Sequence, residues 1–517
     1  MVVARTRCVT LIGVTGHIVE VEADVGHGLA GTHLIGLLDT AVNEARDRVR
    51  SALLNSRFGW PDARITISLF PASLPKRGSV FDLAIAIAVL GAAGAVPAQR
   101  IARPFFLGEL GLDGKIRPVR GVLPAALAAA RAGASTIVAP SLNAAEAALV
   151  PELTVVPAAN LAELVEWLRE DELHRLPIAT EMASAGGDES VSPGEGDGRD
   201  LDLRDVAGQA TGRKALEVCA AGGHNLWMLG PPGTGKTMLA ERLPTLLPSL
   251  QCEQALEVTA IHSVAGTLPP GRPFLVRPPF VAPHHTATVA AVVGGGSGLV
   301  RPGAVSLAHQ GVLFLDEAPE FSANVLDSLR QPLESGEVTV ARAAGTVTFP
   351  AQFMLVLAAN PCPCGEAGTP GRPCRCTPTA RRRYLGRLSG PLLDRIDVKV
   401  RVARATRAEL MADRHVAESS AVVARRVLAA RERARKRLAG TPWRNNAEVG
   451  SAALHTDFRL PTRALAPLHR GLDLGTLSAR GVDRVIRVAW TLADLEGKDR
   501  PGEPETSAAL AMWLGVD

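Results

Sequence analysis

The sequence feature that most constrains the fold is a glycine-rich stretch at residues 230–237, Gly-Pro-Pro-Gly-Thr-Gly-Lys-Thr. It fits the pattern G-x-x-x-x-G-K-[ST], in which backbone N–H groups face phosphate oxygens because glycine has no Cβ to block the approach. The apolar run 225–229 before it has the composition of a buried strand, and residues 238–243 can continue a helix after it. This order of strand, loop and helix predicts a parallel α/β sheet that binds a nucleoside triphosphate.

The loop and the residue after it are predicted to hold ATP and Mg²⁺. Lys236 is expected to reach the β- and γ-phosphates, and the Thr237 hydroxyl is expected to ligate Mg²⁺. The predicted nucleotide-binding residues here are Gly230, Pro231, Pro232, Gly233, Thr234, Gly235, Lys236, Thr237 and Met238.

A second motif supports the first. Residues 312–315 form a short apolar strand candidate that ends in Asp316 and Glu317. Asp316 is placed to hold the Mg²⁺ shell, and Glu317 is placed to polarise the attacking water. A buried strand capped by two solvated acids is the simpler interpretation, which the phosphate loop upstream makes less attractive.

Another predicted strand, residues 353–359, ends at Asn360. In a P-loop sheet this strand lies beside the strand of the phosphate loop, so the Asn360 amide is expected near the γ-phosphate and the attacking water. An asparagine that ends a strand is otherwise a common turn residue. The two preceding motifs favour the catalytic role.

Three arginines are candidates for contacts with phosphate. Arg395 lies in a short polar break before the strand-like run 398–402 and is a candidate finger toward a neighbouring subunit's ATP. An ion pair with Asp394 or Asp397 inside the domain is equally compatible with the sequence. Arg480 and Arg484 lie at the start of a predicted helix and either contact the nucleotide or face solvent.

Four of the seven cysteines lie close together, at Cys362, Cys364, Cys374 and Cys376. Four soft ligands arranged in pairs suit a tetrahedral Zn²⁺, although C-x-C is tighter than the usual C-x₂-C spacing. Reduced thiols in a packed loop and a redox pair are the other interpretations.

Two further features lie near the nucleotide motifs. Residues 337–349 alternate like the two arms of a hairpin, with Arg342 near the tip as a candidate contact for DNA phosphates. An ordinary exposed hairpin is the alternative. Residues 263–310 form a long segment that we interpret as an insertion; its His284 and His285 have no acid or cysteine nearby in sequence, which argues against a metal site there.

The acidic, Gly/Ser/Pro-rich stretch around residues 181–200 cannot bury a core, so it is interpreted as a linker. Before it, we expect strands at 19–25 and 64–69 and helices at 39–54, 81–90 and 123–132. After it, the helical stretches include 422–437 and 480–495. The predicted domains are residues 1–180, a flexible linker at 181–203, a nucleotide domain at 204–402 and a helical domain at 403–517.

Bulk composition narrows the function. A net charge of +4 means that any contact with a polyanion is local, and an aromatic content of 4% argues against a base-stacking platform. The first residues lack a signal-peptide plan, and the longest apolar stretch, 83–96, is shorter than a membrane span. We therefore expect a cytoplasmic protein with no membrane partner.

Taken together, the motifs resemble the YifB/ComM family of magnesium-chelatase-like AAA+ ATPases over nearly the whole chain. The most specific stretches of the resemblance are Pro283-His-His, residues 306–317, Ala359-Asn-Pro-Cys-Pro-Cys-Gly365, Cys374-Arg-Cys and residues 388–397. The resemblance implies a ring, expected to be a hexamer, with ATP between subunits. It also implies Arg395 as a finger in trans, Arg480 as a C-terminal sensor, and the insertion and hairpin lining the pore.

The N-terminal part resembles the Lon-protease/ribosomal-S5-type α/β fold through residues 74–79 and 108–119. Aligning these residues puts Val80 at the nucleophile of Lon peptidases, with Ser79 one place early. The lysine of the Lon dyad would fall near Leu123, and residues 116–135 contain no lysine. Because a serine without a base is not activated, we expect no peptidase activity.

The expected fold is therefore a P-loop AAA+ parallel α/β sheet domain, preceded by a Lon/S5-like α/β domain and followed by a helical lid domain. The expected function is an ATP-hydrolysing translocase or helicase on branched or single-stranded DNA, since ComM-type proteins drive branch migration during recombination of transforming DNA. The alternative is a chelatase-like or chaperone-like motor that remodels a protein client. Two departures from the family pattern, Ala304 and Thr288, do not touch the nucleotide chemistry.

Overall fold

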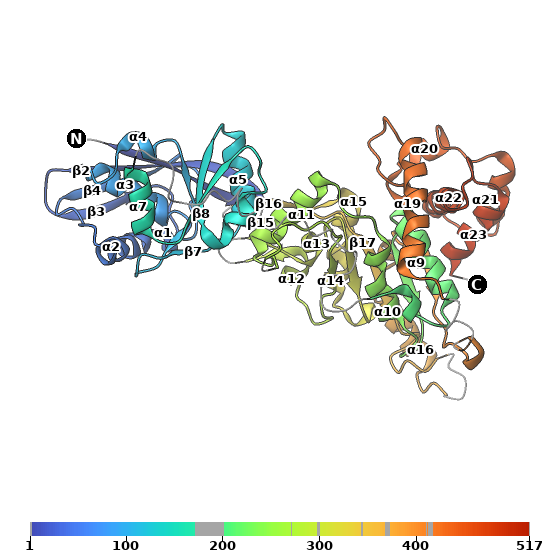
Figure 1. Cartoon of the computed structure of the whole chain (residues 1–517). Coiled ribbons are helices and arrows are strands. Elements are labelled where there is room, and N and C mark those ends of the chain that lie inside the picture. Colours follow the sequence, from blue (N-terminus) through green and yellow to red (C-terminus); the bar gives the residue numbers. More distant parts are fainter. Residues whose placement is uncertain are drawn as a thin grey trace. The chain divides into compact units, whose positions relative to one another are not determined.

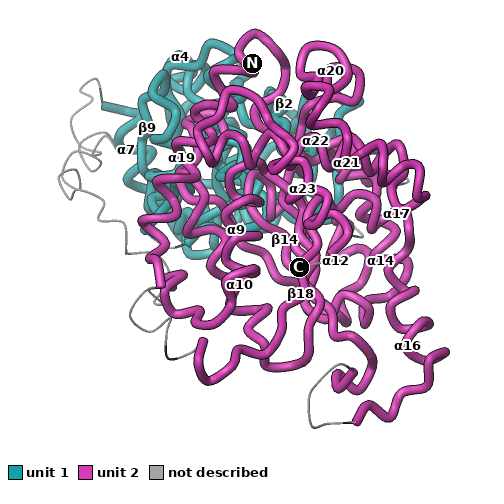
Figure 2. Tube along the Cα trace, turned by 90° about the vertical axis from the view of Figure 1, so that its right-hand side faces the viewer, with its two compact units in different colours: residues 1–193, 255–275, 296–301 teal, residues 194–254, 276–295, 302–517 magenta. Residues whose placement is uncertain are grey.

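The computed structural model describes residues 3–170, 201–269, 271–296, 300–342, 345–367, 373–409, 411 and 417–515. The chain divides into two compact units: residues 1–193, 255–275 and 296–301 form unit 1, and residues 194–254, 276–295 and 302–517 form unit 2 (Figure 2). Most of the predicted linker, residues 181–200, lies outside the described part. No helix among the described residues is long and apolar enough to cross a bilayer.

Unit 1 is built on a seven-stranded mixed sheet in the order β3-β4-β2-β1-β5-β8-β9. β1, β2 and β4 pair antiparallel, and the remaining neighbours pair parallel. The strands are β1 (Ala4–Ile12), β2 (Thr15–Gly26), β3 (Gly31–Ile35), β4 (Arg64–Phe70), β5 (Phe105–Phe106), β8 (Thr136–Pro140) and β9 (Thr154–Ala158). The two predicted strands at 19–25 and 64–69 are confirmed in β2 and β4.

The helices of unit 1 agree with the predicted helical stretches, with one difference. The stretch 39–54 forms two helices, because Glu44 ends the first and precedes the second. The helix at 82–92 shows no polar face because nearly all of its residues are buried. The helices are α1 (Thr40–Asn43), α2 (Ala45–Asn55), α3 (Asp82–Ala92), α4 (Ala98–Ile101), α5 (Val122–Arg131), α6 (Ala144–Ala147) and α7 (Leu161–Arg169).

Unit 2 contains a five-stranded sheet in the order β11-β14-β17-β10-β18, and every neighbouring pair is parallel. Its inner strands are short and apolar because both faces of a parallel sheet are covered. The strands are β10 (Leu226–Leu229), β11 (Phe280–Val281), β14 (Val312–Leu315), β17 (Met354–Ala359) and β18 (Val398–Arg401). The predicted strands are therefore present, and β17 lies beside β10 as predicted.

Short helices and a hairpin surround this sheet (Figure 1). They are α9 (Ala210–Gly222), α10 (Lys236–Arg242), α12 (Val289–Val293), α13 (Ala304–Leu307), α14 (Ala323–Ser328), α15 (Arg330–Ser335), β15 (Glu337–Arg342), β16 (Gly345–Pro350), α16 (Pro378–Leu385) and α17 (Gly390–Leu393). The helix α11 (Cys252–Ala265) contributes residues to both units. The predicted hairpin is confirmed by antiparallel pairing from Glu337↔Pro350 to Arg342↔Gly345.

The C-terminal part of unit 2 is helical, with α19 (Ser420–Arg437), α20 (Ser451–His455), α21 (Thr462–Asp473), α22 (Ala479–Glu496) and α23 (Glu503–Leu514). Its buried side chains belong to the same hydrophobic cluster as the sheet residues of unit 2. Basic side chains of α19 take part in this packing. Arg437 donates two hydrogen bonds to the buried Asp494 carboxylate, at 2.6 and 2.7 Å. The helices and the sheet thus share one core.

Candidate nucleotide site

The phosphate loop connects the end of β10 to the start of α10. Gly233 and Gly235 adopt left-handed backbone angles, with φ of 75° and 87°, which side chains with a Cβ rarely adopt. A Cβ on Gly230 would lie 2.1 Å from the Val402 carbonyl oxygen, so a side chain is excluded there by space. The Thr234 hydroxyl donates to the Pro231 carbonyl at 2.9 Å and closes the loop. The glycine spacing of the motif is therefore a backbone requirement.

Lys236 lies inside this loop and is only 8% exposed. Its Nζ donates to the carbonyls of Gly230 and Pro231 at 2.7 and 2.9 Å, and to Asn360 Oδ1 at 3.2 Å. Burial lowers the pKa of Lys236, while the nearby acids Asp316 and Glu317 oppose that shift. A buried ammonium held by weak neutral acceptors is suited to an anionic ligand such as a phosphate group.

Thr237 and Asp316 meet at the carboxyl edge of the sheet. The Thr237 hydroxyl donates to Asp316 Oδ2 at 2.8 Å. A hydroxyl and a carboxylate are the hard oxygen donors that Mg²⁺ binds together with substrate phosphates. These two residues therefore fit the predicted Mg²⁺ site.

Glu317 follows Asp316 in a strained conformation, with a positive φ of 50°. Its backbone N–H donates to Asp316 Oδ1 at 2.9 Å, and its side chain is about half exposed. The His285 Nδ1 lies 3.9 Å from Glu317 Oε2. Sequence reasoning missed this pairing, because His285 lies on a distant segment and only the fold brings it to the carboxylate.

Asn360 ends β17, the strand between β10 and β14. Its contact with Lys236 places the residue after β17 beside the phosphate loop, which follows β10. Asp316, which follows β14, lies at the same edge through its contact with Thr237. The phenol of Tyr384, on α16, lies near the Asn360 backbone, and burial raises the pKa of Tyr384 to about 12. Sequence reasoning did not identify Tyr384, the single tyrosine of the chain, as part of this site.

The three candidate arginines lie at the opposite, amino edge of the sheet. Arg395 precedes β18, whose first residue pairs with the first residue of β10, whereas the phosphate loop follows the last residue of β10. A strand of four residues at about 3.3 Å each separates the two edges by on the order of 10 Å. Arg395 therefore lies across the sheet from the phosphate loop of its own chain.

The partners of these arginines differ from the ion pairs considered from sequence. Arg395 contacts Glu334 and the Pro391 carbonyl. Burial lowers the pKa of Arg395, and the nearby guanidinium groups of Arg480 and Arg484 lower it further.

Asp397 is bound instead by Arg484, at 2.8 Å. Burial would raise the pKa of Asp397, but Arg484 and His224 hold it below its usual value. At the amino edge, the arginines therefore lie around one buried acid, Asp397.

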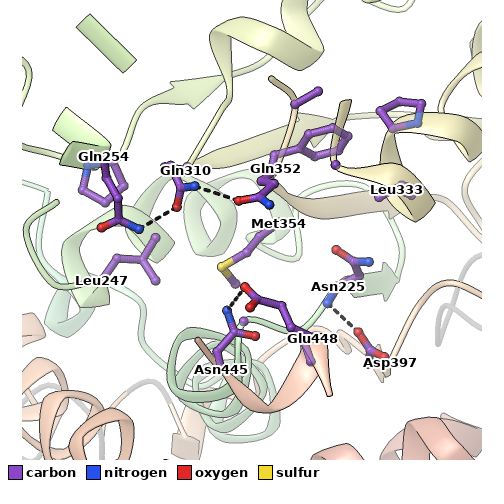
Figure 3. A pocket seen from close by; sticks show the side chains of 18 of the residues that line it. Asn225, Leu247, Gln254, Gln310, Leu333, Gln352, Met354, Asp397, Asn445 and Glu448 are labelled. Atoms are coloured by element: carbon purple, nitrogen blue, oxygen red, sulfur yellow. Dashed lines mark hydrogen bonds between the residues drawn. The ribbon is translucent and has the colours of Figure 1, made fainter. Parts of the chain in front are cut away.

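A cavity of about 490 Å³ opens at this amino edge (Figure 3). Amide side chains link across it, from Gln254 to Gln310 and from Gln310 to Gln352, each at 2.9 Å. Asn225, which precedes β10, donates its backbone N–H to Asp397 Oδ2 at 2.9 Å. The phosphate-loop residues do not line this cavity, so it is separate from the nucleotide site.

Arg342 is the last residue of β15, and its side chain is exposed. Residues 343–344 of the turn lie outside the described part of the chain. A Cβ on Gly295 would lie 2.9 Å from an Nη atom of Arg342, so the guanidinium rests against that glycine. The basic group is therefore presented beside the inserted segment.

The four clustered cysteines converge on one point. The Cys362 Sγ lies 3.3 Å from Cys364 Sγ and 3.5 Å from Cys374 Sγ, and all four sulfurs lie within 4.8 Å of one another. A tetrahedral metal with Zn–S bonds of about 2.3 Å separates its sulfurs by about 3.8 Å. The sulfur positions therefore fit a Zn²⁺ ion.

Backbone N–H groups point at these sulfurs. Cys376 N donates to Cys374 Sγ at 3.4 Å, and the backbones of Ala367 and Glu366 hydrogen-bond Cys362 and Cys364. The Glu366 contact, together with the neighbouring thiols, lowers the pKa of Cys364 to about 6. The shift favours the thiolate of Cys364, the form that binds metal, whereas burial raises the pKa of Cys362.

In unit 1, the positions that align with the Ser–Lys dyad of Lon peptidases do not hold a serine paired with a lysine. Ser79 contacts the Glu109 carboxylate. Leu123, where a lysine would fall, is fully buried, and its backbone N–H donates to Glu146 at 2.8 Å.

The parallel sheet, the phosphate loop, the acid pair and the polar residue between them define a P-loop nucleoside triphosphatase of the AAA+ class. Comparison with known proteins refines this class. Family models described as "Magnesium chelatase, subunit ChlI", "Subunit ChlI of Mg-chelatase" and "Magnesium chelatase, subunit ChlI C-terminal" match residues 202–410, 21–143 and 417–512.

Several relatives match over nearly their full length. An uncharacterised protein of Mycobacterium tuberculosis is 51% identical over 512 residues, 99% of each chain. The competence protein ComM of Haemophilus influenzae is 42% identical over 500 residues, 96% of this chain and 95% of ComM. The uncharacterised protein YifB of Escherichia coli is 41% identical over 488 residues, 94% and 92% of the two chains.

The chain belongs to the YifB/ComM family of magnesium-chelatase-like AAA+ proteins. A shorter match, 32% identity over 146 residues, links 27% of the chain to 18% of Lon protease 2 of Thermus thermophilus.

Proposed function

We propose that this protein hydrolyses ATP to move along branched or single-stranded DNA, as a ring of subunits in the cytoplasm. The observation that carries the proposal is the meeting of Lys236, Thr237, Asp316 and Asn360 at one edge of the sheet. Each of these side chains has the chemistry that phosphoryl transfer needs at its position.

In this proposal Lys236 binds the β- and γ-phosphates, and Thr237 and Asp316 hold Mg²⁺, which would neutralise charge that develops on the phosphates. Glu317 orients the attacking water and accepts its proton, which its half-exposed position permits. Asn360 positions the γ-phosphate through its contact with Lys236. The side chains therefore divide into phosphate binding, metal binding and water activation.

The arginines at the amino edge support the proposed ring. Because Arg395, Arg480 and Arg484 gather on the edge opposite the phosphate loop, they cannot serve the ATP of their own chain without a large rearrangement. A neighbouring subunit can present its phosphate loop to them, and repetition of that head-to-tail contact closes a ring, which we propose is a hexamer. Arg395 then acts as a finger in trans, and Arg480 and Arg484 support it.

The proposal that DNA is the partner rests on different observations. The family includes a protein named for competence, and the exposed Arg342 on the hairpin can contact phosphates without reading bases. We propose that the hairpin and the inserted segment line the pore and that the motor drives branch migration during recombination of incoming DNA. The affinity for DNA should then be independent of sequence and sensitive to salt.

A second candidate is a motor that remodels a protein client, as a chelatase-like or chaperone-like protein would. The family models named for a magnesium chelatase subunit support it. The two candidates share the ATPase chemistry and differ in the partner that stimulates ATP turnover.

We propose that residues 1–180 form a Lon/S5-like domain without peptidase activity, 204–402 the AAA+ domain and 403–517 a helical lid domain; most of the predicted linker, 181–203, lies outside the described residues. The buried Leu123 at the place of the dyad lysine supports the absence of peptidase activity. We also assign a structural Zn²⁺ to Cys362, Cys364, Cys374 and Cys376, supported by their convergence.

The proposal is tested by unwinding of a labelled branched junction with ATP, comparing the intact protein with Lys236→Ala. A matched control is Lys436→Ala, which removes an exposed lysine of α19 far along the chain from the loop. Loss of unwinding and ATP turnover in Lys236→Ala alone supports a DNA motor. If the intact protein does not unwind the junction and DNA does not change its rate of ATP turnover, the DNA role is overturned. The motor that remodels a protein client is then favoured.

A further inference from the structure

The four-cysteine cluster lies in the connection between the nucleotide-site residue Asn360 and the helix α16. Cys362 is the second residue after Asn360, and Cys376 immediately precedes Thr377, which caps α16. The first pair of cysteines is thus joined to β17, and the second pair is joined to α16. A single ion bound by all four fixes both ends of this connection.

The connection touches the phosphate loop. Gly365 has a left-handed φ of 75°, and a Cβ on it would lie 2.6 Å from ring atoms of Pro232. Gly365 N also donates to the Cys362 carbonyl at 2.9 Å, which ties this contact to the cluster. Pro232 belongs to the phosphate loop, so the connection packs directly against that loop.

The C-terminal end of the connection, at α16, also lies near the nucleotide site. Tyr384 on α16 is 5% exposed and lies near the backbone of Asn360. Just beyond α16, Arg387 donates to the Pro319 carbonyl at 2.9 Å and to Glu320 at 3.2 Å. Pro319 follows Glu317 by two residues, so α16 braces the ends of both β17 and β14.

We propose that a Zn²⁺ ion in the four-cysteine cluster positions Asn360 against the phosphate loop, so that ATP hydrolysis depends on the metal while nucleotide binding does not. This inference rests on the proposed ATPase activity. The cysteines are positioning residues, since they act on Asn360 through the chain that joins them to it and through Tyr384 on α16. Nucleotide binding is retained because Lys236 and the loop glycines are held by β10 and α10.

The size of the effect follows from the precision of the site. Without the metal, the four sulfurs would lose the bonds to a shared ion that would join the two cysteine pairs, and the ends of the connection would gain freedom. A displacement of about 1 Å in a catalytic arrangement costs roughly 100-fold in rate. We therefore expect kcat to fall roughly 10- to 100-fold, while the Kd for nucleotide changes less than about threefold.

The experiment uses the full chain carrying Cys252→Ser, which removes the exposed cysteine outside the cluster. Zinc content is measured by mass spectrometry before and after release with a mercurial, and again after thiol reduction and addition of Zn²⁺. ATP turnover and the affinity for a fluorescent ATP analogue are followed in each state. Stoichiometric zinc, a loss of kcat without a loss of affinity on release, and recovery on reloading support the inference.

Two outcomes overturn the inference alone: an intact, active protein that contains no zinc, and unchanged kcat after zinc is released. ATP turnover absent from the zinc-loaded protein would overturn the proposed ATPase activity and this inference with it. The zinc-loaded state therefore separates the two failures.

A second variant tests the connection without touching a metal ligand. Tyr384→Phe removes the hydroxyl that meets the Asn360 backbone and keeps the ring that fills the core. We expect stoichiometric zinc, unchanged nucleotide affinity and a kcat lowered roughly three- to tenfold, in line with the loss of one polar contact. Unchanged kcat in Tyr384→Phe would overturn the transmission through α16.

Discussion

Replacement of Glu317 by glutamine tests the chemical core of the site most directly. The change keeps the size of the side chain and removes the group that can accept a proton. The Glu317 side chain is about half exposed, and His285 Nδ1 lies 3.9 Å from its Oε2. A substitution at such a position alters the free energy of unfolding by no more than about 0.5 kcal/mol, so the fold should be unaffected.

The magnitude follows from general-base catalysis, which contributes about 10²- to 10⁴-fold to a rate. At about 1.36 kcal/mol per factor of ten, Glu317→Gln should raise the activation barrier by about 2.7–5.4 kcal/mol. Lys236, Thr237 and Asp316 keep their contacts with one another or with the loop, so binding of ATP should be preserved.

The assay pairs single-turnover hydrolysis of ATP with titration of a fluorescent ATP analogue. Glu432→Gln, which changes an exposed acid on α19, is a matched control. Hydrolysis in Glu317→Gln within threefold of the unmodified protein would remove Glu317 from the mechanism. A large loss of nucleotide affinity would instead show that the carboxylate serves binding.

Three further predictions concern other parts of the chain. Arg395→Ala should lower ATP turnover at least 10³-fold. Mixing this variant with Lys236→Ala should restore part of the activity, because some subunit interfaces then join an intact phosphate loop to an intact Arg395. A mixture as inactive as its two components would exclude action in trans. Arg342→Ala should weaken binding to DNA of any sequence and reduce its salt dependence, measured by fluorescence anisotropy at several salt concentrations; an unchanged affinity would exclude the hairpin contact. Arg437→Ala should destabilise unit 2 by about 3–5 kcal/mol in urea unfolding, because it leaves the buried Asp494 carboxylate without its charged partner; a loss below about 1 kcal/mol would contradict this account.

The sequence predicted the sheet of the nucleotide unit well, because its information is local. The apolar runs before residue 230, Asp316 and Asn360 are typical of strands in a covered parallel sheet. Glycines at 233 and 235 are favoured by left-handed backbone angles. A parallel sheet then brings the residues that follow its strands to one edge. The contact of Thr237 with Asp316 and that of Lys236 with Asn360 follow from this geometry.

The sequence alone determined which residue types follow each strand and that four cysteines lie within reach of one another. Only the tertiary structure decided their partners. Arg395 contacts Glu334 instead of its sequence neighbours, His285 lies beside Glu317, and Tyr384 returns to Asn360. Each of these contacts joins segments far apart along the chain, where no local backbone constraint or periodicity sets the distance; packing of the whole unit sets it.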